Sequence, residues 1–402
     1  MTSTRRVTGL GRPEVLVNAA AKPQVPGAIR TREPLQIHRR LPGYAPTPLV
    51  RCADLAAELG VRAVWVKDET WRLGLPAFKM LGASYAVYRT LIERLGHEVD
   101  WAGVADLRAE LHVLGPLTLA AATDGNHGRA VARMARLLGL SAAIYVPAGT
   151  VAERIAAIES EGATVTVVVG DYDAAVRRSA LEASADCIVV SDTSWPGYTR
   201  TPTWVVEGYS TVFAEVSDQL IAAGAGEPDL VVVPVGVGAL AAAAVHHFKA
   251  EGLARTPFLL GVEPRSARCV LESLRAGHLV TVPGPHPSIM AGLNCGTPSQ
   301  IAWPFLMAGM DAMVAMEDDW ARRAMRALAT AGIVAGETGA AALGGLLAVC
   351  ETPEGAPIRE AIRLNSGSSV LLLCTEGATD AHAWEQIVGR PVPGQVSPER
   401  SG

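Results

Sequence analysis

Long apolar runs, basic blocks and paired-cysteine motifs are all missing from this chain of 402 residues. Its first 50 residues are polar and contain no apolar run typical of a signal peptide. The longest charge-free stretch of interest, residues 230–245, is short for a membrane span and is interrupted by Pro234, Gly236 and Gly238. We therefore expect a cytoplasmic protein with no membrane partner.

The charge balance argues against a nucleic-acid partner, because the formal net charge is −5 and no basic block occurs. The six cysteines are irregularly spaced and lack the CxxC spacing typical of metal sites, so we predict no bound metal. Free cysteines of this kind are typical of a reducing compartment. The sequence leaves open whether Cys269 and Cys295 pair.

Lysine is scarce, since only four of the 35 basic residues are lysines. Lys22 lies in a tail that contains proline, Lys67 has two acids beside it and is expected in an exposed ion pair, and Lys249 is expected at a solvated helix end. Lys79, in GLPAFKMLGASY, has no charged neighbour. A buried, unpaired lysine has a lowered pKa, which suits an amine nucleophile. The alternative is a lysine whose tip reaches water.

Strand-like and helix-like segments alternate along the chain. Strands are expected at 62–69, 141–149, 164–170, 187–192, 257–264 and 368–377, and helices at 83–95, 152–163, 174–185 and 321–332. Segments 117–140 and 229–252 each predict a strand, a glycine-containing turn and a helix. This order predicts an α/β fold with mostly parallel strands and helices on both faces. Ligands bind such sheets at the carboxyl ends of the strands.

Three turns fall at those strand ends. In TDGNHG, residues 123–128, backbone N–H groups at a helix start favour an anion, and Asn126 offers both donor and acceptor atoms. The alternative is that Asp124 only caps the helix and His127 only packs. In CTEGATD, residues 374–380, a hydroxyl and acids follow an apolar strand. The alternative is an ordinary polar turn without a ligand.

The remaining turn, PVGVGAL at 234–240, lets the backbone approach a phosphate at a helix N-terminus. It lacks the Gly-Lys-Ser ending of a Walker loop. Glu263 at the end of the next strand keeps a nucleotide-binding dehydrogenase open as an alternative, although the third glycine of that fingerprint is missing. An amine, a phosphate turn and an asparagine turn together are what pyridoxal phosphate needs.

These motifs resemble the tryptophan-synthase-β group of pyridoxal-phosphate enzymes (fold type II), and within it the diaminopropionate ammonia-lyases. The likeness extends from residue 41 to residue 380 and is carried by VKDE, AFKMLGASYA, TDGNHGRAVA, SDTSWPGY, PVGVGALAAA, GVEP, IMAGLNCG, GETGAAAL and TEGATD. TDGNHGR discriminates best, because most threonine-dehydratase-like relatives have Ser-x-Gly-Asn-His there. The later DTSWPGY, at 192–198, also favours the ammonia-lyase branch.

The resemblance implies two doubly wound, mostly parallel α/β domains with the active site between them. Residues 1–85 and 200–402 would form the large cofactor-binding domain and residues 86–199 the small domain. The proline and glycine content after Arg390 separately predicts a loose tail at about 391–402. The resemblance also implies a homodimer that binds pyridoxal 5'-phosphate and a small amino-acid substrate.

The resemblance implies a role for each matching residue. Lys79 would carry the cofactor, Asn126 would hydrogen-bond the phenolic oxygen of its ring, Thr375 would face the pyridine nitrogen, and Glu337 would lie near the ring. The backbone N–H groups that would bind the phosphate belong to Gly236, Val237, Gly238, Ala239 and Leu240. The substrate would contact Thr123, Asp124, Gly125, His127 and Asp192. The catalytic residues would be Lys79, Asp124 and Asp192.

The implied reaction is α,β-elimination of 2,3-diaminopropionate, as the D or L form or both, to pyruvate and two ammonia. Lys79 would be the base for the L form and Asp124 for the D form. The sequence departs from the family at four positions, with Leu73 for Phe, Pro76 for Asn, Ala83 for Gly and Ala378 for Asp. The alternatives are a serine or threonine dehydratase, a related β-replacement enzyme, a nucleotide-binding dehydrogenase and a non-catalytic binding module.

Overall fold

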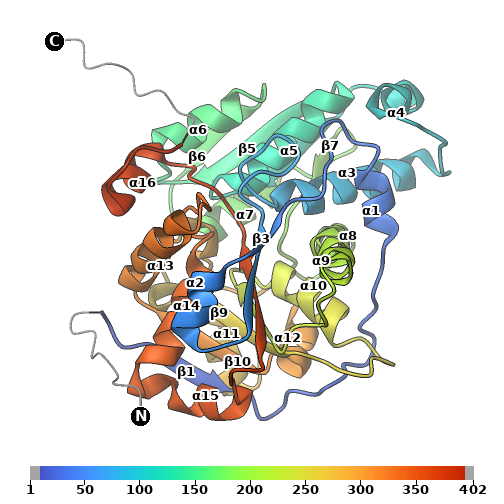
Figure 1. Ribbon diagram of the computed structural model, residues 1–402. Coiled ribbons are helices and arrows are strands. Elements are labelled where there is room, and N and C mark those ends of the chain that lie inside the picture. The colour runs from blue at the N-terminus through green and yellow to red at the C-terminus, as the bar shows by residue number, and fades with distance from the viewer. Residues whose placement is uncertain (1–9, 394–402) are drawn as a thin grey trace.

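The computed structural model describes residues 10–393, which form two sheets. The larger sheet has seven strands in the order β1-β10-β9-β8-β11-β3-β2, and the smaller has four in the order β6-β5-β4-β7. The large-sheet strands are β1 Glu14–Val17, β2 Leu49–Arg51, β3 Ala63–Asp68, β8 Leu230–Pro234, β9 Phe258–Pro264, β10 Ala312–Met316 and β11 Ser369–Cys374. The small-sheet strands are β4 Thr118–Ala122, β5 Ser141–Pro147, β6 Thr164–Val168 and β7 Cys187–Val189. The small sheet lies above the large one in Figure 1.

The helices connect and cover these strands. Those between β3 and β7 are α3 Lys79–Leu95, α4 Val104–Leu111, α5 Asn126–Leu138, α6 Ala152–Glu159 and α7 Tyr172–Ala180. The others are α1 Glu33–His38, α2 Ala53–Leu59, α8 Arg200–Gly208, α9 Ser210–Ala222, α10 Ala239–Phe248, α11 Cys269–Ala276, α12 Trp303–Gly309, α13 Asp318–Thr330, α14 Ala341–Glu351, α15 Ala356–Ile362 and α16 Ala381–Val388. Short 3-10 turns lie at His112–Leu114, Arg265–Ala267, Ala291–Leu293 and Pro353–Gly355. The predicted domain boundary after residue 85 falls inside α3.

The prediction of a mostly parallel α/β fold is confirmed. The inner strands pair in parallel, and β8 and β11 are buried along their whole length, as parallel strands covered on both faces must be. The two edges of the large sheet are different, because β1 pairs antiparallel with β10 and β2 pairs antiparallel with β3. The sequence did not predict either edge strand, since each has too few residues to show a pattern.

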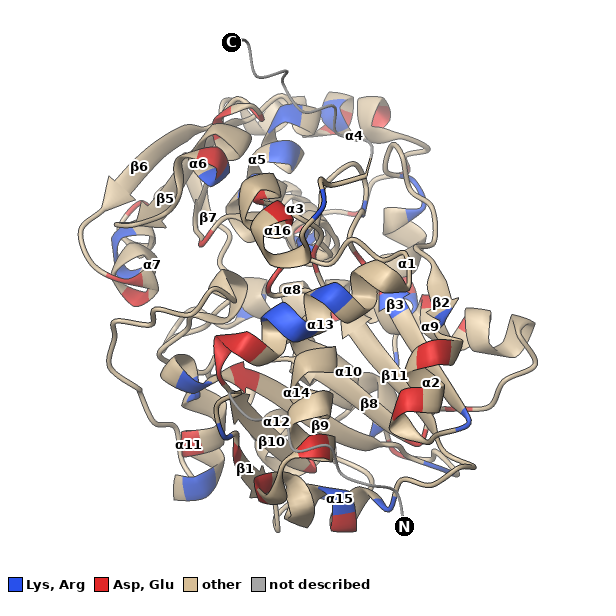
Figure 2. Ribbon diagram, turned by 60° about the vertical axis from the view of Figure 1, so that its left-hand side comes forward, with Lys and Arg blue, Asp and Glu red and all other residues tan. Residues whose placement is uncertain are grey.

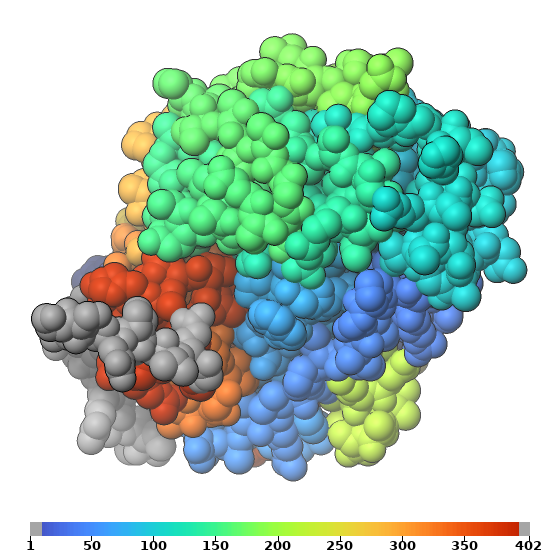
Figure 3. All heavy atoms as spheres, turned by 90° about the horizontal axis from the view of Figure 1, so that it is seen from above, coloured from blue at the N-terminus to red at the C-terminus, as the bar shows by residue number. Residues whose placement is uncertain are grey.

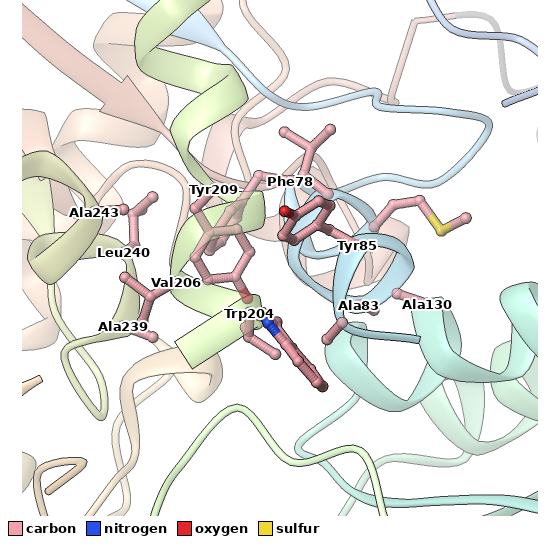
Figure 4. Packing of buried hydrophobic residues seen from close by; sticks show 14 of the residues in the cluster. Phe78, Ala83, Tyr85, Ala130, Trp204, Val206, Tyr209, Ala239, Leu240 and Ala243 are labelled. Atoms are coloured by element: carbon pink, nitrogen blue, oxygen red, sulfur yellow. The ribbon is translucent and has the colours of Figure 1, made fainter. Parts of the chain in front are cut away.

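Alternate residues of the central strands enter two separate apolar clusters, one on each face of the large sheet. Val231 and Leu371 belong to the cluster that also contains α3, α8, α10 and the small-sheet residues Leu119 and Ile144. Figure 4 shows where this cluster packs α3, α5, α8 and α10 together. The two sheets therefore share one continuous core, and α3, which begins at Lys79, runs through it.

Two lysines lie differently from the prediction. Lys67 is fully buried in β3, and its Nζ donates to Glu215 Oε2 at 2.7 Å. Lys249 is also buried, and its Nζ donates to Asp311 Oδ2 at 2.8 Å. The prediction of solvated side chains was wrong for both, because each lysine pairs with a carboxylate that is distant in the sequence.

The surface carries charges of both signs. Figure 2 shows Lys and Arg interspersed with Asp and Glu on outer helices such as α13. Figure 3 shows that the small sheet and its helices, coloured teal to green, make up most of the face seen from above. Within residues 10–393, none of the helices combines the length and the apolar character that crossing a bilayer requires. Residues 394–402 of the predicted loose tail lie outside the described residues.

Candidate active site

A pocket lies where the turns after β4, β8 and β11 meet the start of α3. Its lining comprises Phe78, Lys79, Asp124, Asn126, Tyr172, Asp192, Pro234, residues 236–240, residues 291–295, Thr338, Thr375 and Glu376. Several of them follow the carboxyl ends of strands in both sheets, where ligands bind in parallel α/β folds: Asp124 and Asn126 follow β4, residues 236–240 follow β8, and Thr375 and Glu376 follow β11. The pocket therefore has one wall from each sheet.

Lys79 is the first residue of α3 and the only base among the described residues that line this pocket. Its Nζ donates to Asp192 Oδ2 at 2.6 Å, and its side chain is 17% exposed. Burial by itself lowers the pKa of Lys79, but Asp192 and Asp124 outweigh burial and raise the pKa well above its usual value. The prediction of an unpaired lysine with a lowered pKa was wrong, because Asp192 lies 113 residues away in the chain.

Asp192 is held at both carboxylate oxygens. Oδ2 accepts from Lys79, and Oδ1 accepts from the hydroxyl of Tyr172 at 2.8 Å. Burial favours the neutral acid, but the ammonium of Lys79 holds the pKa of Asp192 below its usual range. The sequence did not single out Tyr172, whose only signal is its place at the first position of α7.

Asp124 lies in the turn after β4. Gly125, not Asp124, is the N-cap of α5, so the structure does not support a simple capping role for the aspartate. Burial raises the pKa of Asp124, whereas the charges of Lys79 and Arg154 oppose that rise. The Arg154 guanidinium also donates to the backbone oxygen of Asp124 at 3.3 Å. A carboxylate with a raised pKa can take and return a proton closer to neutral pH.

Asn126 and Thr375 face the pocket from opposite sheets. Asn126 begins α5, and its Nδ2 donates to Glu376 Oε2 in a short hydrogen bond. Thr375 follows β11, and its hydroxyl donates to the backbone oxygen of Thr338 at 3.5 Å. No local pattern singles out Glu376 or Thr338, although Glu376 lies in TEGATD and Thr338 in GETGAAAL.

The turn after β8 fits a phosphate group. Gly238 has φ +95°, and a Cβ at that position would lie 2.5 Å from Leu306 Cδ1, so only glycine fits. Helix α10 begins at Ala239, and the N–H groups of a first helical turn have no partner within their own helix. These donors and the positive end of the helix dipole suit a dianion. Lys79, Asn126, Thr375 and this turn therefore form a set that fits pyridoxal phosphate.

Two aromatic rings lie near Lys79, and one of them, Phe78, lines the pocket. The rings of Phe78 and Tyr209 lie 4.7 Å apart between their centroids. Both residues are labelled in Figure 4. A Cβ at Gly82 would lie 2.5 Å from Tyr209 Cε1, so this glycine makes room for the ring. Among the described residues, the buried hydroxyl of Tyr209 has no hydrogen-bond partner.

The other residues predicted for the site lie outside the lining of this pocket. Thr123 Oγ1 accepts from the Gly125 N–H at 2.8 Å, which shapes the turn. His127 is buried, with its Nε2 2.8 Å from the backbone oxygen of Val190. Glu337 lines a neighbouring cavity together with Arg154, and burial raises the pKa of Glu337 to about 7.

Cys295 lines the pocket and Cys269 lies near it, at the start of α11. Both are free thiols. Burial raises the pKa of each thiol well above its usual value, and nearby carboxylates add to the effect.

Comparisons of this chain with known proteins all indicate the same enzyme family. A family model described as pyridoxal-phosphate dependent enzyme matches residues 40–362. The diaminopropionate ammonia-lyase of Escherichia coli K12 is 37% identical over 360 residues, which is 88% of this chain and 89% of that enzyme. The enzyme of the same name from Salmonella typhimurium is 34% identical over 89% of this chain and 91% of its own length.

A solved structure has the same architecture. The crystal structure of the Escherichia coli diaminopropionate ammonia-lyase in complex with an aminoacrylate-PLP azomethine reaction intermediate superimposes with a TM-score of 0.84. It is 34% identical in sequence, and the match covers 94% of this chain and 97% of that chain.

Proposed function

Because the chain belongs to the family of pyridoxal-phosphate dependent enzymes, we propose that it eliminates ammonia from 2,3-diaminopropionate and so yields pyruvate and a second ammonia. One observation carries the choice of substrate. Among the described side chains that line the pocket, Asp124, Asp192 and Glu376 are acids and Lys79 is the base. Diaminopropionate can carry two ammonium groups and serine only one, so an acidic pocket favours the diamino acid.

Bound pyridoxal phosphate supplies an electron sink that makes the α-proton of an amino acid acidic. Lys79 would hold the cofactor and move that proton at its Nζ. Either role requires the ammonium of Lys79 to give up a proton that its ion pair with Asp192 Oδ2, at 2.6 Å, stabilises in the protein without cofactor. Positioned proton transfer of this kind is worth about 10² to 10⁴ in rate.

Asp124 would be the second base. Its raised pKa suits proton transfer at the α-carbon, and it lines the same pocket as Lys79. We infer that Lys79 serves the L isomer and Asp124 the D isomer. Asp192, held by Lys79 and Tyr172, would bind the β-ammonium group of the substrate by charge until it leaves as ammonia.

The remaining predicted residues have supporting roles in this proposal. The N–H groups of residues 236–240 would bind the phosphate, Asn126 the phenolic oxygen and Thr375 the ring nitrogen. Thr123, Gly125 and His127 would shape the turn that receives the substrate carboxylate. Glu337 would approach the cofactor ring from the neighbouring cavity that it lines.

A substrate panel tests this proposal. The purified protein, loaded with pyridoxal phosphate, is assayed with D- and L-diaminopropionate, serine and threonine, and both pyruvate and ammonia are measured. We expect diaminopropionate to be preferred and to give two ammonia per pyruvate. Lys79→Ala should lower the turnover rate at least about 10³-fold. Lys22→Ala is the control, because Lys22 lies at an exposed position.

Two other results of the panel contradict the proposal. Preference for serine, with one ammonia per pyruvate, would make the protein a serine dehydratase. Turnover that survives in Lys79→Ala would remove the assigned role of the lysine.

We also propose that the chain works as a homodimer in the cytoplasm. Support for the dimer comes from the family resemblance, and support for the cytoplasm comes from the six free cysteines, which are typical of a reducing compartment. Light scattering of the eluted protein should give twice the mass of one chain, and a monomeric mass would contradict this part of the proposal.

A further inference from the structure

Glu376 is a buried carboxylate without an assigned role. It follows Thr375 after β11 and is 2% exposed. Its Oε2 accepts from Asn126 Nδ2, and its Oε1 accepts from the Thr338 N–H at 3.2 Å. We propose that Glu376 is a positioning residue that fixes the side-chain amide of Asn126 and thereby presents an amide N–H to the cofactor ring.

The chemistry of the two groups supports this role. An ionised carboxylate only accepts hydrogen bonds, so the nitrogen of the Asn126 amide must face Glu376. An amide nitrogen has two hydrogens, and the one not used by Glu376 is a donor for another acceptor. Without the carboxylate, the oxygen and nitrogen of Asn126 can exchange places at little cost. The link to the cofactor rests on the function proposed above.

The backbone around Glu376 is too tightly packed to shift easily. A Cβ at Gly339 would lie 2.1 Å from the backbone oxygen of Glu376, and a Cβ at Gly336 would lie 2.3 Å from the backbone oxygen of Gly377. The Gly336 N–H also donates to the Glu376 oxygen at 3.0 Å. These close approaches fix the backbone of Glu376 relative to residues 336–339, and the Thr338 N–H holds its carboxylate at Oε1. The carboxylate can therefore act as a fixed reference for a neighbouring side chain.

The hydrogen bond also joins the two sheets. Asn126 begins the helix that follows β4 of the small sheet, whereas Glu376 follows β11 of the large sheet. The charge of Glu376 acts on the same wall, since it helps to raise the pKa of Asp124. The amide of Asn126 is therefore oriented from the opposite wall of the pocket.

Asparagine NMR tests the hydrogen bond directly. The chain has four asparagines, Asn18, Asn126, Asn294 and Asn365, so selective 15N labelling of their side chains gives four amide pairs. Loss of one pair in Asn126→Ala assigns the signal. In the cofactor-free wild type we expect the Asn126 pair to exchange with solvent at least about tenfold more slowly than that of exposed Asn365.

Glu376→Gln replaces one of the two acceptor oxygens by an NH2 group, so the side chain can no longer accept from both Asn126 and Thr338, and the Asn126 pair should lose protection and shift. Glu337→Gln is the matched control, because it removes a nearby carboxylate that has no hydrogen bond to Asn126. An unchanged Asn126 pair in Glu376→Gln would overturn the proposal. If Glu376→Gln does not fold, the wild-type measurement still decides, since exchange as fast as that of Asn365 would also overturn it.

The absorbance band of the bound cofactor tests the link to the ring. We expect Glu376→Gln to shift the band or its pH midpoint in the wild-type background and to cause no further shift in Asn126→Ala, because Glu376 acts through Asn126. Additive shifts would show an independent effect and overturn the proposal. Failure of the substrate assay would leave the NMR result standing, so the two proposals can fail separately.

Discussion

At the scale of single residues, the charge on Asp124 depends on its neighbours. Burial raises its pKa, and Lys79 and Arg154 oppose that rise. Arg154→Gln removes one of the two opposing charges, so the pKa of Asp124 should rise further. The base form then needs a higher pH, and the acid limb of kcat/KM for D-diaminopropionate should move upward.

The pH profile of kcat/KM checks this prediction for each isomer. Arg136→Gln is the matched control, since Arg136 is half exposed on α5 and pairs with Glu161 instead. The L isomer should shift less, because Lys79 is its proposed base. A downward shift, or equal shifts in both arginine variants, would contradict the assigned effect of Arg154.

Residue identity was easier to predict from the sequence than residue environment. Lys79, Asp124, Asn126 and Thr375 each lie at a strand end or helix start, so the strand pattern placed them at one edge and the structure puts them in one pocket. The partner of a lysine is set by the tertiary fold, and no local pattern encodes it. For the same reason the sequence did not find the contact between Asn126 and Glu376.

At the scale of elements, a buried ion cluster joins β3, the loop before α3 and α9. Glu215 accepts from Lys67 at 2.7 Å and from both terminal nitrogens of Arg72 at 2.7 Å, and Arg72 also pairs with Glu69. The exposed fractions of Lys67, Arg72, Glu69 and Glu215 are 0–2%. The cluster thus anchors the loop that leads to Lys79.

Glu215→Gln should lower the free energy of unfolding by about 3–5 kcal/mol, because it leaves two cations buried with one carboxylate. Burial favours neutral Glu215, but Arg72 and Lys67 lower its pKa to about 2. Its contribution is therefore complete at neutral pH and is lost only as the pH falls toward that value. Urea unfolding measures the change.

The control for this cluster lies on the same helix. Asp218 of α9 pairs with Arg32 at the surface, where the two side chains are 47% and 51% exposed. Asp218→Asn should cost less than about 1 kcal/mol. Similar losses in both variants would show that the buried position of Glu215 is not the cause.

Some helices and strands were predictable from the sequence, and others were not. The helix over α5 and the strands β3, β8, β9 and β11 agree with the expected segments. Helix α14 was not predicted, because AALGGLLAVCE is apolar on nearly every side and shows no helical period. Strand β10, AMVAM, was not predicted either, because alanine and methionine outnumber its one β-branched residue, Val314.

At the scale of the whole molecule, the pocket joins two sheets that share one apolar cluster. A cofactor that contacts residues 123–128 on one side and 236–240 on the other links both sheets through itself. A ligand that binds only the folded protein stabilises the folded state. Local hydrogen exchange shows which segments of the chain the ligand stabilises. The architecture thus makes cofactor removal a test of how the two walls are connected.

We therefore predict that removal of pyridoxal phosphate speeds hydrogen exchange in both walls together, at residues 123–128 and 236–240. The α9 peptide around Glu215 should change little, because the ion cluster holds that helix without the cofactor. Lys79→Ala should weaken cofactor binding and reproduce the exchange pattern of the cofactor-free protein at low cofactor concentration. Faster exchange in only one wall would show that the cofactor contacts a single sheet, which would contradict a pocket with one wall from each sheet.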